Sequence, residues 1–425
     1  MKVLVIGSGG REHAICTAFA RSARVDKIYC ANGNAGIAAV AECIAIKPDE
    51  IAELADFAER EAIDLTFVGG ETALALGIVD EFEKRGSRIV GPSCAAARLE
   101  ASKSFAKDFM ARHNVPTARY KVADSPSAAI SMLESGHFGG RDTPVVVKAD
   151  GLAAGKGVVV ARDRAEAVEA LSELAAVVGE AAMERIVLEE CLFGREVSLL
   201  MFADGENFKL MPPVRDHKRI GEGDTGPNTG GMGTITDDSL LDDEQTSTIV
   251  ETIIRPTLSG CLREGFRFRG VLFLGLMMTV DGPKVLEYNV RFGDPETQAI
   301  LVRLETDIVE ICEAMLDGSL DRLDIRWKPG SSACVILAAE DYPAKPRTGD
   351  AISGLDAAAA IDGVTVFHSG TARGVSGELV TAGGRVLGVT ASARDLDAAI
   401  ALAYAAVSQI SWDGMQYRRD IGRTR

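Results

Sequence analysis

Short apolar runs alternate with helical patterns along the first hundred residues. The run Lys-Val-Leu-Val-Ile at 2 to 6 is followed by a glycine-rich turn and then by a helical pattern through Arg21. Uninterrupted apolar runs joined by helices are typical of a parallel sheet that is covered on both faces. The pattern predicts a doubly wound α/β domain over residues 1–101. Its expected strands are 2 to 6, 27 to 31, 64 to 69 and 88 to 91, and its expected helices are 49 to 61 and 72 to 85.

Two more units are predicted after this domain. A helix from about 102 to 113 leads into residues 102–326, whose small lobe is expected at about 120–190 and whose large lobe is expected at about 191–326. Residues 327–425 are expected to form a C-terminal α+β domain. The expected strands are 145 to 149, 157 to 161, 186 to 190, 196 to 203, 208 to 214, 271 to 279, 284 to 289, 332 to 339, 364 to 368 and 385 to 391, and the expected helices are 243 to 264 and 396 to about 407.

Composition narrows the possible functions. The chain has 425 residues, 47% of them apolar, and a net charge of -16, which disfavours nucleic acid and anionic membranes as partners. No stretch reaches the roughly 18 apolar residues of a membrane span and no signal-peptide pattern is present, so we expect a cytoplasmic protein. The eight cysteines are scattered without metal-binding spacing and are expected to be buried thiols. An anionic substrate must then be held by a local group of donors.

The turn after the first strand has more than one interpretation. Gly9 and Gly10 precede a helix, where backbone N–H groups and the helix dipole favour a phosphate. A dinucleotide fingerprint needs a third glycine where Glu12 stands and an acidic residue where Ala31-Asn32 occurs, so an oxidoreductase is disfavoured. Two interpretations stay open. One is a site for a single sugar phosphate, formed by free N–H groups of Gly9, Gly10 and Arg11 and by the Arg11 cation, and the other is a turn without a ligand.

A glycine-rich segment follows a buried strand at 145 to 158, Val-Val-Val-Lys-Ala-Asp-Gly-Leu-Ala-Ala-Gly-Lys-Gly-Val. Lys148 lies inside the apolar strand, where an unpaired ammonium is costly. A triphosphate would pair with it, while N–H groups of a flap containing Gly151, Gly155 and Gly157 would cover the outer phosphates. A glycine hairpin whose lysine reaches solvent is the alternative.

An acid, an amide and a guanidinium follow each other at period two late in the large lobe. Glu287, Asn289 and Arg291 share one face of a strand, and carboxylate and carbonyl oxygens are ligands that magnesium prefers. Arg291 would bind a carboxylate or neutralise a transferring phosphoryl group. Residues 216 to 233 form a glycine-rich polar segment whose length is typical of a functional loop, and Lys218 near its start favours an anionic ligand.

Together these segments resemble the ATP-grasp superfamily and, within it, the glycinamide ribonucleotide synthetase family. The resemblance covers essentially the whole chain, and the last two of its strings are the most specific. The strings are Gly-Gly-Arg-Glu-His-Ala at 9 to 14, Lys-Ala-Asp-Gly-Leu-Ala-Ala-Gly-Lys-Gly-Val at 148 to 158, Asp-His-Lys-Arg at 216 to 219, Gly-Pro-Asn-Thr-Gly-Gly-Met-Gly at 226 to 233 and Arg-Phe-Gly-Asp-Pro-Glu-Thr-Gln at 291 to 298.

The resemblance implies an ATP-grasp architecture and a ligase that joins glycine to 5-phosphoribosylamine through glycyl phosphate, with ATP as co-substrate and Mg²⁺ or Mn²⁺ as the metal. A monomer is expected. The implied metal ligands are Glu287 and Asn289, and the implied catalytic residues are Lys218 near the γ-phosphate and Arg291 at the acyl phosphate. The implied ATP-binding residues are Lys103, Lys148, Gly151, Gly155, Lys156, Gly157, Glu189, Glu190, Leu192 and Glu196, with the adenine at 188 to 192 and the ribose at Glu196. The implied substrate-binding residues are Gly9, Gly10, Arg11, Asp216, Asn228, Thr229, Gly230, Gly231 and Asp294.

Some positions depart from the family pattern. Gly70, Thr72 and Ala73 lie where the family usually has Gly-Pro-Glu-Ala-Pro-Leu, and Arg215 stands where glutamine is usual. Gly275 replaces an acidic metal ligand of many ATP-grasp proteins, so the identity of a second carboxylate on the metal stays open. The alternative functions are another ATP-grasp ligase or carboxylase with a different acceptor, and a nucleotide-binding regulator without turnover.

Overall fold

A five-stranded parallel sheet forms the N-terminal domain in the computed structural model, which describes residues 1–152 and 157–423. The strand order is β3-β2-β1-β4-β5, so the first strand lies at the centre and the chain crosses to both sides of it. The doubly wound α/β fold predicted from the apolar runs is confirmed. The strands are β1 (Lys2–Gly7), β2 (Lys27–Asn32), β3 (Glu42–Ile44), β4 (Leu65–Val68) and β5 (Ile89–Val90).

Helices cover both faces of this sheet because its central strand is apolar on both sides. Val5 lies in one buried cluster with side chains of α1 (Gly10–Ala20), whereas Leu4 lies in another with side chains of α2 (Ile51–Arg60). The single helix that the sequence predicts at 72 to 85 is wrong. Gly77, whose φ is +84°, interrupts it in a left-handed conformation. The two separate helices are α3 (Glu71–Ala75) and α4 (Ile78–Lys84).

Two further helices, α5 (Cys94–Ala101) and α6 (Lys103–Arg112), carry the chain out of this domain. The hydroxyl of Ser102 accepts a hydrogen bond from the Phe105 N–H at 3.2 Å and so forms the N-cap of α6. The second helix therefore starts at Lys103. A side chain four residues later on a helix shares its face, which places Lys103 and Lys107 on one side of α6.

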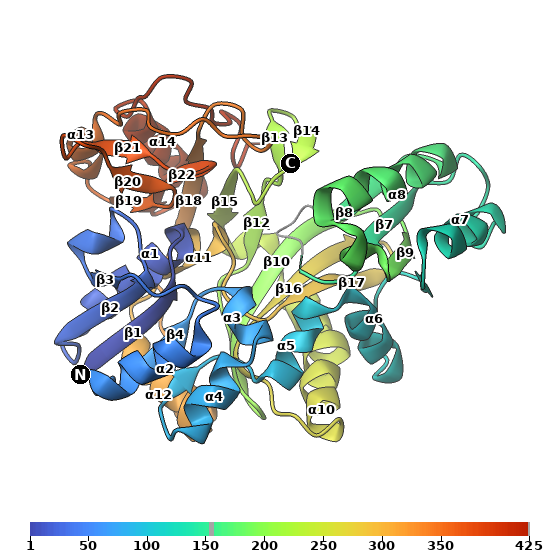
Figure 1. Ribbon diagram of the computed structural model, residues 1–425, viewed down its shortest axis with the longest axis horizontal. Coiled ribbons are helices and arrows are strands. Elements are labelled where there is room, and N and C mark those ends of the chain that lie inside the picture. Colours follow the sequence, from blue (N-terminus) through green and yellow to red (C-terminus); the bar gives the residue numbers. More distant parts are fainter. Residues whose placement is uncertain (153–156, 424–425) are drawn as a thin grey trace.

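A four-stranded sheet and two helices form the small lobe, which projects from the rest of the molecule (Figure 1). The strand order is β6-β9-β7-β8, and all of these pairs are antiparallel. Strand β6 and helix α7 have no counterpart in the sequence prediction, since a four-residue edge strand carries little apolar signal. The elements are β6 (Tyr120–Ala123), α7 (Pro126–Glu134), β7 (Val145–Ala149), β8 (Val158–Ala161), α8 (Arg164–Val178) and β9 (Ile186–Glu190).

A nine-stranded sheet runs through the large lobe and into the C-terminal part of the chain, in the order β17-β16-β10-β12-β15-β18-β22-β19 with β11 paired to β10. Because β15 and β18 pair directly, one sheet crosses the boundary that the sequence predicts at residue 326, and that boundary stays a prediction. The strands are β10 (Arg195–Asp204), β11 (Phe208–Leu210), β12 (Val214–Asp216), β15 (Gly233–Thr236), β16 (Arg269–Thr279), β17 (Gly282–Asn289), β18 (Ser331–Ala338), β19 (Val364–His368) and β22 (Arg385–Ala393).

Two short hairpins lie outside the large sheet. One pairs β13 (Arg219–Gly221) with β14 (Thr225–Asn228), and the other pairs β20 (Thr371–Arg373) with β21 (Leu379–Thr381). The first hairpin occupies part of a segment for which the sequence predicts a loop. The strand predicted at 208 to 214 is confirmed only for its first three residues, which form β11, because Pro212-Pro213 cannot donate the N–H groups of a continuous ladder.

The remaining helices pack on the large sheet, α12 on β10 and α14 on β18 and β22. The helix predicted at 243 to 264 is present as one continuous stretch in which a π-helical turn, Val250–Ile254, joins two α-helices. The helices are α9 (Asp243–Ile249), α10 (Arg255–Arg263), α11 (Glu296–Leu301), α12 (Ile308–Asp317), α13 (Leu355–Ala359) and α14 (Leu396–Val407).

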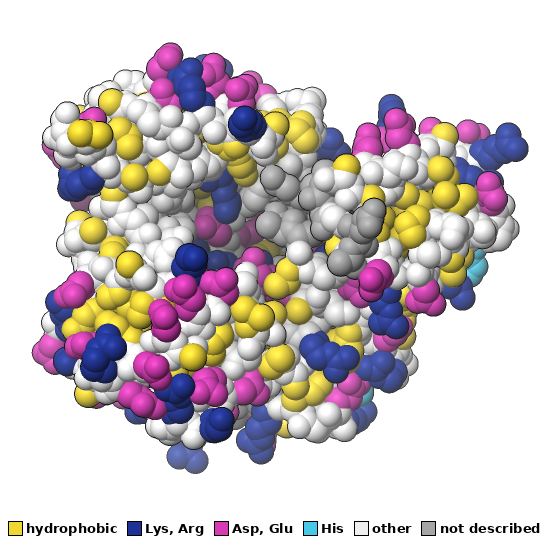
Figure 2. Space-filling model, viewed as in Figure 1, with side chains coloured by type: hydrophobic (Ala, Val, Ile, Leu, Met, Phe, Trp, Pro, Cys, Tyr) yellow, Lys and Arg dark blue, Asp and Glu magenta, His cyan; other side chains and the backbone are white. Residues whose placement is uncertain are grey.

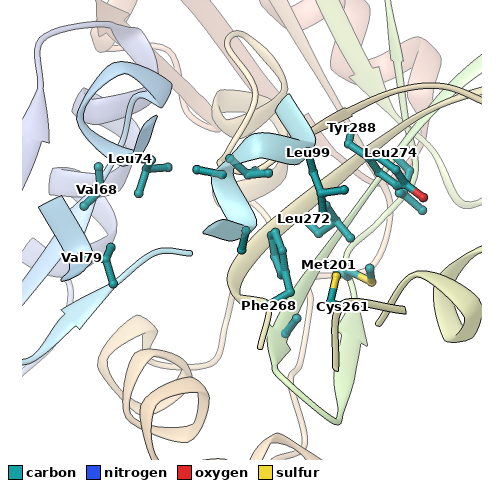
Figure 3. Close-up of a cluster of buried hydrophobic side chains, with 14 of the residues drawn as sticks. Val68, Leu74, Val79, Leu99, Met201, Cys261, Phe268, Leu272, Leu274 and Tyr288 are labelled. Carbon is teal, nitrogen blue, oxygen red and sulfur yellow. The ribbon is translucent and has the colours of Figure 1, made fainter. Parts of the chain in front are cut away.

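Buried apolar side chains fix the N-terminal domain against the large lobe (Figure 3). Leu74 and Leu99 from the first domain lie in one buried cluster with Phe268 and Leu272 from the second. Burial of such side chains stabilises the folded state by about 1.5–3 kcal/mol each, so the turn before α1 has a fixed position relative to the end of β17.

The cysteines are only partly as the sequence predicts. All eight are free thiols, and five of them are buried, but Cys43 and Cys94 are exposed. Among the residues that the structure describes, no helix has both the length and the apolar character needed to cross a bilayer.

Candidate active site

A hollow opens between the small lobe, the N-terminal domain and the C-terminal part of the chain, and charged side chains lie on its floor (Figure 2). Contacts across it link elements that are far apart in sequence. Lys148 at the end of β7 reaches the Leu286 carbonyl of β17, and the Arg11 N–H in the first turn of α1 reaches Asp294 beyond β17. Most residues that the sequence singles out therefore lie around one cleft.

Lys148 is buried and paired, so the alternative in which it reaches solvent is wrong. Its ammonium lies 2.8 Å from Glu189 Oε1 on β9 and donates to the Leu286 carbonyl at 3.1 Å. Lys107 Nζ lies 2.9 Å from the other oxygen of the same carboxylate. Two cations and one anion leave a net positive charge between the lobes, which suits an anionic ligand.

The first turn of α6 is tied to the start of the flap. Lys103 Nζ donates to the Gly151 carbonyl at 2.7 Å, and the Asp150 carboxylate accepts from the Ser104 hydroxyl at 2.5 Å. Burial lowers the pKa of Lys103, and the charges of Glu287 and Asp150 oppose this only in part. Of the other predicted flap residues, the Gly157 carbonyl accepts the Ala149 N–H at 2.9 Å, whereas Gly155 and Lys156 lie outside the described residues.

At the hinge between β9 and β10, the acidic side chains are engaged by cations. Glu190 accepts from Arg119 Nε at 2.6 Å, and since neighbouring strand residues face opposite sides, it lies on the other face from Glu189. Leu192 follows the strand and is half-buried. At the start of β10, Glu196 accepts from Lys218 Nζ at 3.1 Å.

The contact between Glu196 and Lys218 joins the residue expected at the ribose to the residue expected at the γ-phosphate. This ion pair must open if both residues are to bind ATP. Burial would lower the pKa of Lys218, but the carboxylates of Glu196, Glu287 and Asp216 outweigh it and raise that pKa above its ordinary value. Lys218 is therefore a cation in the protein without substrates, and its ammonium can exchange Glu196 for a phosphate.

Glu287 and Asn289 lie at the end of β17, on the face that borders the cleft. No ion pair of Glu287 occurs within the described parts of the chain, and three lysines surround it at longer range. Burial would raise the pKa of Glu287, but the charges of Lys218, Lys148 and Lys103 hold it below the ordinary value.

The two oxygen donors of Glu287 and Asn289 fit a magnesium-sized ion that shares phosphate ligands, because such an ion needs few protein ligands. Gly275 pairs directly with Glu287 across the β16–β17 ladder, so no carboxylate faces it there. The described residues hold no cluster of three or more His, Cys, Asp or Glu side chains arranged to bind a metal by themselves. A metal at this place would therefore depend on the nucleotide for its remaining ligands.

Arg291 follows β17 and is held by acidic residues of the N-terminal domain. Its Nη2 lies 2.7 Å from Glu100 Oε1 and donates to Asn289 Oδ1 at 3.2 Å, and its Nε lies 3.1 Å from Glu71 Oε2. Burial would raise the pKa of Glu71, but Arg291 and Arg11 lower it to about 2. The guanidinium thus has a fixed orientation at the boundary between the nucleotide side and the N-terminal turn.

The expected anion site at the N-terminal turn is altered by Glu12. The carboxylate of Glu12 accepts the Gly9 N–H at 2.6 Å and Arg11 Nε at 2.7 Å, and the Arg11 N–H points to Asp294 Oδ2 at 3.4 Å. The prediction of three free N–H groups is therefore wrong for Gly9 and Arg11. A glutamate three residues into a helix commonly binds back to the N-cap in this way. A Cβ at Gly7 would meet Glu12 Cδ at 2.5 Å, so this carboxylate also fills the space below the turn.

Residues of the C-terminal part hold Asp294 and the loop 226 to 233 beside this turn. Arg385 on β22 donates to the Asp294 carbonyl at 2.6 Å and also to the Gly230 carbonyl. Tyr342 Oη accepts the Gly230 N–H at 3.1 Å. The C-terminal part therefore supports the expected substrate loop.

The same loop is joined to Lys218 through its backbone. The N–H and the hydroxyl of Thr229 each donate to the Lys218 carbonyl at 2.8 Å. Asn228 lies exposed at the end of β14 and pairs with Arg219 in the hairpin. Movement of Lys218 and of Thr229 is thereby coupled.

A pair of carboxyl groups lies under the loop. The Asp216 Oδ1 atom has no hydrogen-bond partner in the described residues, and a Cβ at Gly231 would approach it to 2.8 Å. Burial and the charge of Glu296 raise the pKa of Asp216 well above its ordinary value. The absence of a side chain at Gly231 leaves the space that this buried carboxyl group occupies beneath the loop.

Several site residues are missed by the sequence prediction. Glu12 has a detectable signal, the spacing of a capping box, but the sequence interpretation treats it only as an absent glycine. Lys107 is one helical turn after Lys103, and that spacing could have identified it. Nothing in the local pattern indicates that Glu71, Glu100 and Arg385 reach the site, since their partners are 91 to 220 positions away in the sequence.

The small lobe holds a buried lysine, Lys148, and faces the large sheet, which carries Glu287, across a cationic cleft. This arrangement defines an ATP-grasp protein. Three domain models of phosphoribosylglycinamide synthetase match the chain: the N domain at residues 1–100, the ATP-grasp (A) domain at 101–297 and the C domain at 332–424. The chain belongs to the phosphoribosylglycinamide synthetase family.

Individual relatives agree with this membership. Phosphoribosylamine–glycine ligases of Xanthomonas axonopodis pv. citri and Caldanaerobacter subterraneus subsp. tengcongensis are 47% and 46% identical to the chain, over 99% of it and over 97% and 99% of their own lengths. The crystal structure of phosphoribosylamine–glycine ligase from Thermotoga maritima aligns with a TM-score of 0.83 at 33% identity, covering 99% of this chain and all of that one. A more distant structure shares the fold alone. The biotin carboxylase domain of Hydrogenobacter thermophilus 2-oxoglutarate carboxylase aligns with a TM-score of 0.75 at 17% identity, covering 98% of this chain and 91% of that one.

Proposed function

We propose that this protein joins glycine to 5-phosphoribosylamine at the expense of ATP, giving glycinamide ribonucleotide, ADP and phosphate. The observation that carries the proposal is the direct connection between two parts of the cleft. Lys218 places its ammonium at Glu196 on the nucleotide side, and its carbonyl holds Thr229 of the loop 226 to 233 on the acceptor side. The names of relatives that match nearly the whole chain at 46% and 47% identity support the same reaction.

The first step is phosphoryl transfer to the glycine carboxylate, in which a carboxylate oxygen attacks the γ-phosphorus and ADP leaves. Such a reaction asks for position and charge neutralisation rather than for a protein nucleophile. Lys103, Lys148 and Lys218 supply cations on the nucleotide side. Glu287 and Asn289 would hold the metal, which supplies further neutralisation of phosphate charge when bound.

The second step is attack of the amine of 5-phosphoribosylamine on the carbonyl carbon of glycyl phosphate. The amide bond forms, inorganic phosphate leaves, and the amine gives up a proton. Arg291 lies where it can neutralise the acyl phosphate, since Glu71 and Glu100 fix its orientation. The Arg11 cation would exchange its contact with Glu12 for the sugar phosphate. The Gly10 N–H, which donates to no protein acceptor within residues 1–152 and 157–423, would bind the same phosphate.

The test is release of ADP from Mg²⁺–ATP with glycine, alanine or bicarbonate as the acceptor acid, with and without freshly prepared phosphoribosylamine. We expect ADP release that requires glycine and phosphoribosylamine together. Equal release with alanine or bicarbonate would contradict the assignment. Bicarbonate is included because the fold is shared with biotin carboxylase domains.

Three finer points belong to the same proposal. The metal is Mg²⁺, with Mn²⁺ as a substitute, because oxygen ligands and phosphates suit both ions. We propose that the protein acts as a monomer. A cytoplasmic location fits the eight free thiols, which a reducing compartment maintains.

A further inference from the structure

Lys107 is a fully buried lysine to which the proposed reaction assigns no role. Its side chain is 2% exposed, as is that of Glu189, and the two form an ion pair at 2.9 Å. Lys107 Nζ also donates to the Thr117 hydroxyl at 2.7 Å, and that hydroxyl donates to the Val285 carbonyl at 2.6 Å. Lys107 is therefore held at a fixed place between α6, β9 and β17.

The two lysines on Glu189 are not equivalent. Each donates a hydrogen bond to a second acceptor, Lys107 to the Thr117 hydroxyl and Lys148 to the Leu286 carbonyl, but Lys107 is the more deeply buried, at 2% exposed against 8%. Lys148 lies at the cleft, and although its ammonium is 2.8 Å from Glu189 Oε1, that oxygen receives no hydrogen bond of good geometry within the described residues. The Lys148 contact is thus an ion pair without directional attachment, and Lys148 is the partner that can leave.

Departure of Lys148 toward a phosphate would strip Glu189 of its counter-ion if Lys107 were absent. A buried carboxylate without a cation is strongly unfavourable. With Lys107 in place, Glu189 stays neutralised whether or not Lys148 is bound to it. Burial lowers the pKa of Lys107 to about 8, but the ammonium form is retained at neutral pH.

We propose that Lys107 is a positioning residue for the nucleotide: it is the permanent counter-ion of Glu189 and so releases Lys148 to bind the phosphates. The inference rests on the proposed nucleotide side of the reaction but not on the identity of the acceptor. This role is more than structural, because replacement of Lys107, which would not touch the nucleotide, should weaken nucleotide binding specifically.

The test is titration calorimetry with Mg²⁺–ADP in the absence of any acceptor acid. We expect Lys107→Met to raise the dissociation constant at least tenfold, because Lys148 becomes the sole counter-ion of Glu189. The double variant Lys107→Met/Glu189→Gln removes the carboxylate that traps Lys148. We expect its dissociation constant to return to within about threefold of the wild-type value.

Arg303→Met is the matched control, since Arg303 is also a cation that is 2% exposed but lies at Thr236 and Asp238, away from the nucleotide side. It should lower the melting temperature without changing ADP binding. The proposal is overturned if Lys107→Met binds ADP normally, if the double variant binds as weakly as Lys107→Met, or if Arg303→Met weakens ADP binding equally. Failure of the wild-type protein to bind Mg²⁺–ADP would overturn it together with the proposed function, whereas ADP binding without glycine-dependent turnover would affect the acceptor assignment alone.

Discussion

Replacement of Lys148 by methionine tests the nucleotide side of the site most directly. Methionine keeps the length and apolar character of the lysine stem in β7 but removes the ammonium. Glu189 loses the cation at 2.8 Å and retains Lys107 at 2.9 Å, so its carboxylate is still neutralised. The fold should therefore tolerate the change, with a loss of stability below the about 3 to 5 kcal/mol that follows when a buried charge loses its only partner.

The expected kinetic effect follows from the same distances. At an effective dielectric constant of about 20, two unit charges 2.8 Å apart attract each other by about 6 kcal/mol before desolvation. If a phosphate oxygen replaces Glu189 at a similar distance from Lys148, the Coulomb energy changes little. Lys148 therefore lowers the activation free energy mainly as negative charge develops on the transferring phosphoryl group. Loss of one such preorganised donor costs about 2 to 4 kcal/mol, which corresponds to a fall of about 30- to 900-fold in kcat/KM for ATP.

The assay is steady-state ADP release at saturating glycine and phosphoribosylamine with ATP varied. Thermal unfolding of the same preparation establishes that the variant is folded. A folded Lys148→Met protein with unchanged kcat/KM for ATP would show that the charged group between the lobes does not bind the nucleotide. A fall in kcat/KM for glycine with no change for ATP would place Lys148 at the acceptor instead.

Two further predictions concern the metal and the response to acid. Glu287→Gln should raise the magnesium concentration needed for half-maximal activity, and because the pKa of Glu287 is held below its ordinary value, the variant should also lose some stability at neutral pH. A normal magnesium curve would remove Glu287 from the metal site. Burial lowers the pKa of His217 from 6.5 to about 4, so neutral His217 stabilises the fold above pH 6.5. The free energy of unfolding should fall by about 3 kcal/mol as the pH falls from 6.5 through about 4, because the unfolded chain takes up a proton first. Urea unfolding between pH 7 and 4 should show a smaller pH dependence for His217→Gln, and identical slopes would refute this.

The strands and most helices could be predicted because each is a local pattern. The runs at 145 to 149 and 186 to 190 coincide with β7 and β9, since a buried strand reads as uninterrupted apolar residues. The failures have local causes of another kind. Gly77 breaks a helix by its left-handed conformation, and Pro212-Pro213 break a strand by lacking N–H groups, although the apolar periodicity continues through both positions.

The site could be predicted only where its residues share a segment. Glu287, Asn289 and Arg291 come from one strand and the turn after it, and they are found together. The partners of Arg291, Glu71 and Glu100, could not be predicted, because their contacts arise only when the N-terminal domain packs on the large lobe.

Ion pairs within the site allow a strongly acidic chain to hold several cations ready for anionic substrates. Lys148 is paired with Glu189, Lys218 with Glu196, and Arg11 with Glu12, so these three cations are compensated before the substrates arrive. Each pair can open with little change in Coulomb energy if a phosphate or carboxylate takes the place of the glutamate. A lone monovalent anion would replace only one of these contacts, whereas a nucleotide triphosphate can replace those of Lys148 and Lys218 together.

Arg291 differs from these cations, because two glutamates and an amide hold its guanidinium at once. Exchange of all three partners for a single ligand would be unfavourable, so this side chain has to act from its present position. Fixed cations suit a charge that develops during a reaction, since they require no reorganisation at that moment. Exchangeable lysines for binding and a fixed arginine for the acyl phosphate are therefore consistent with one another.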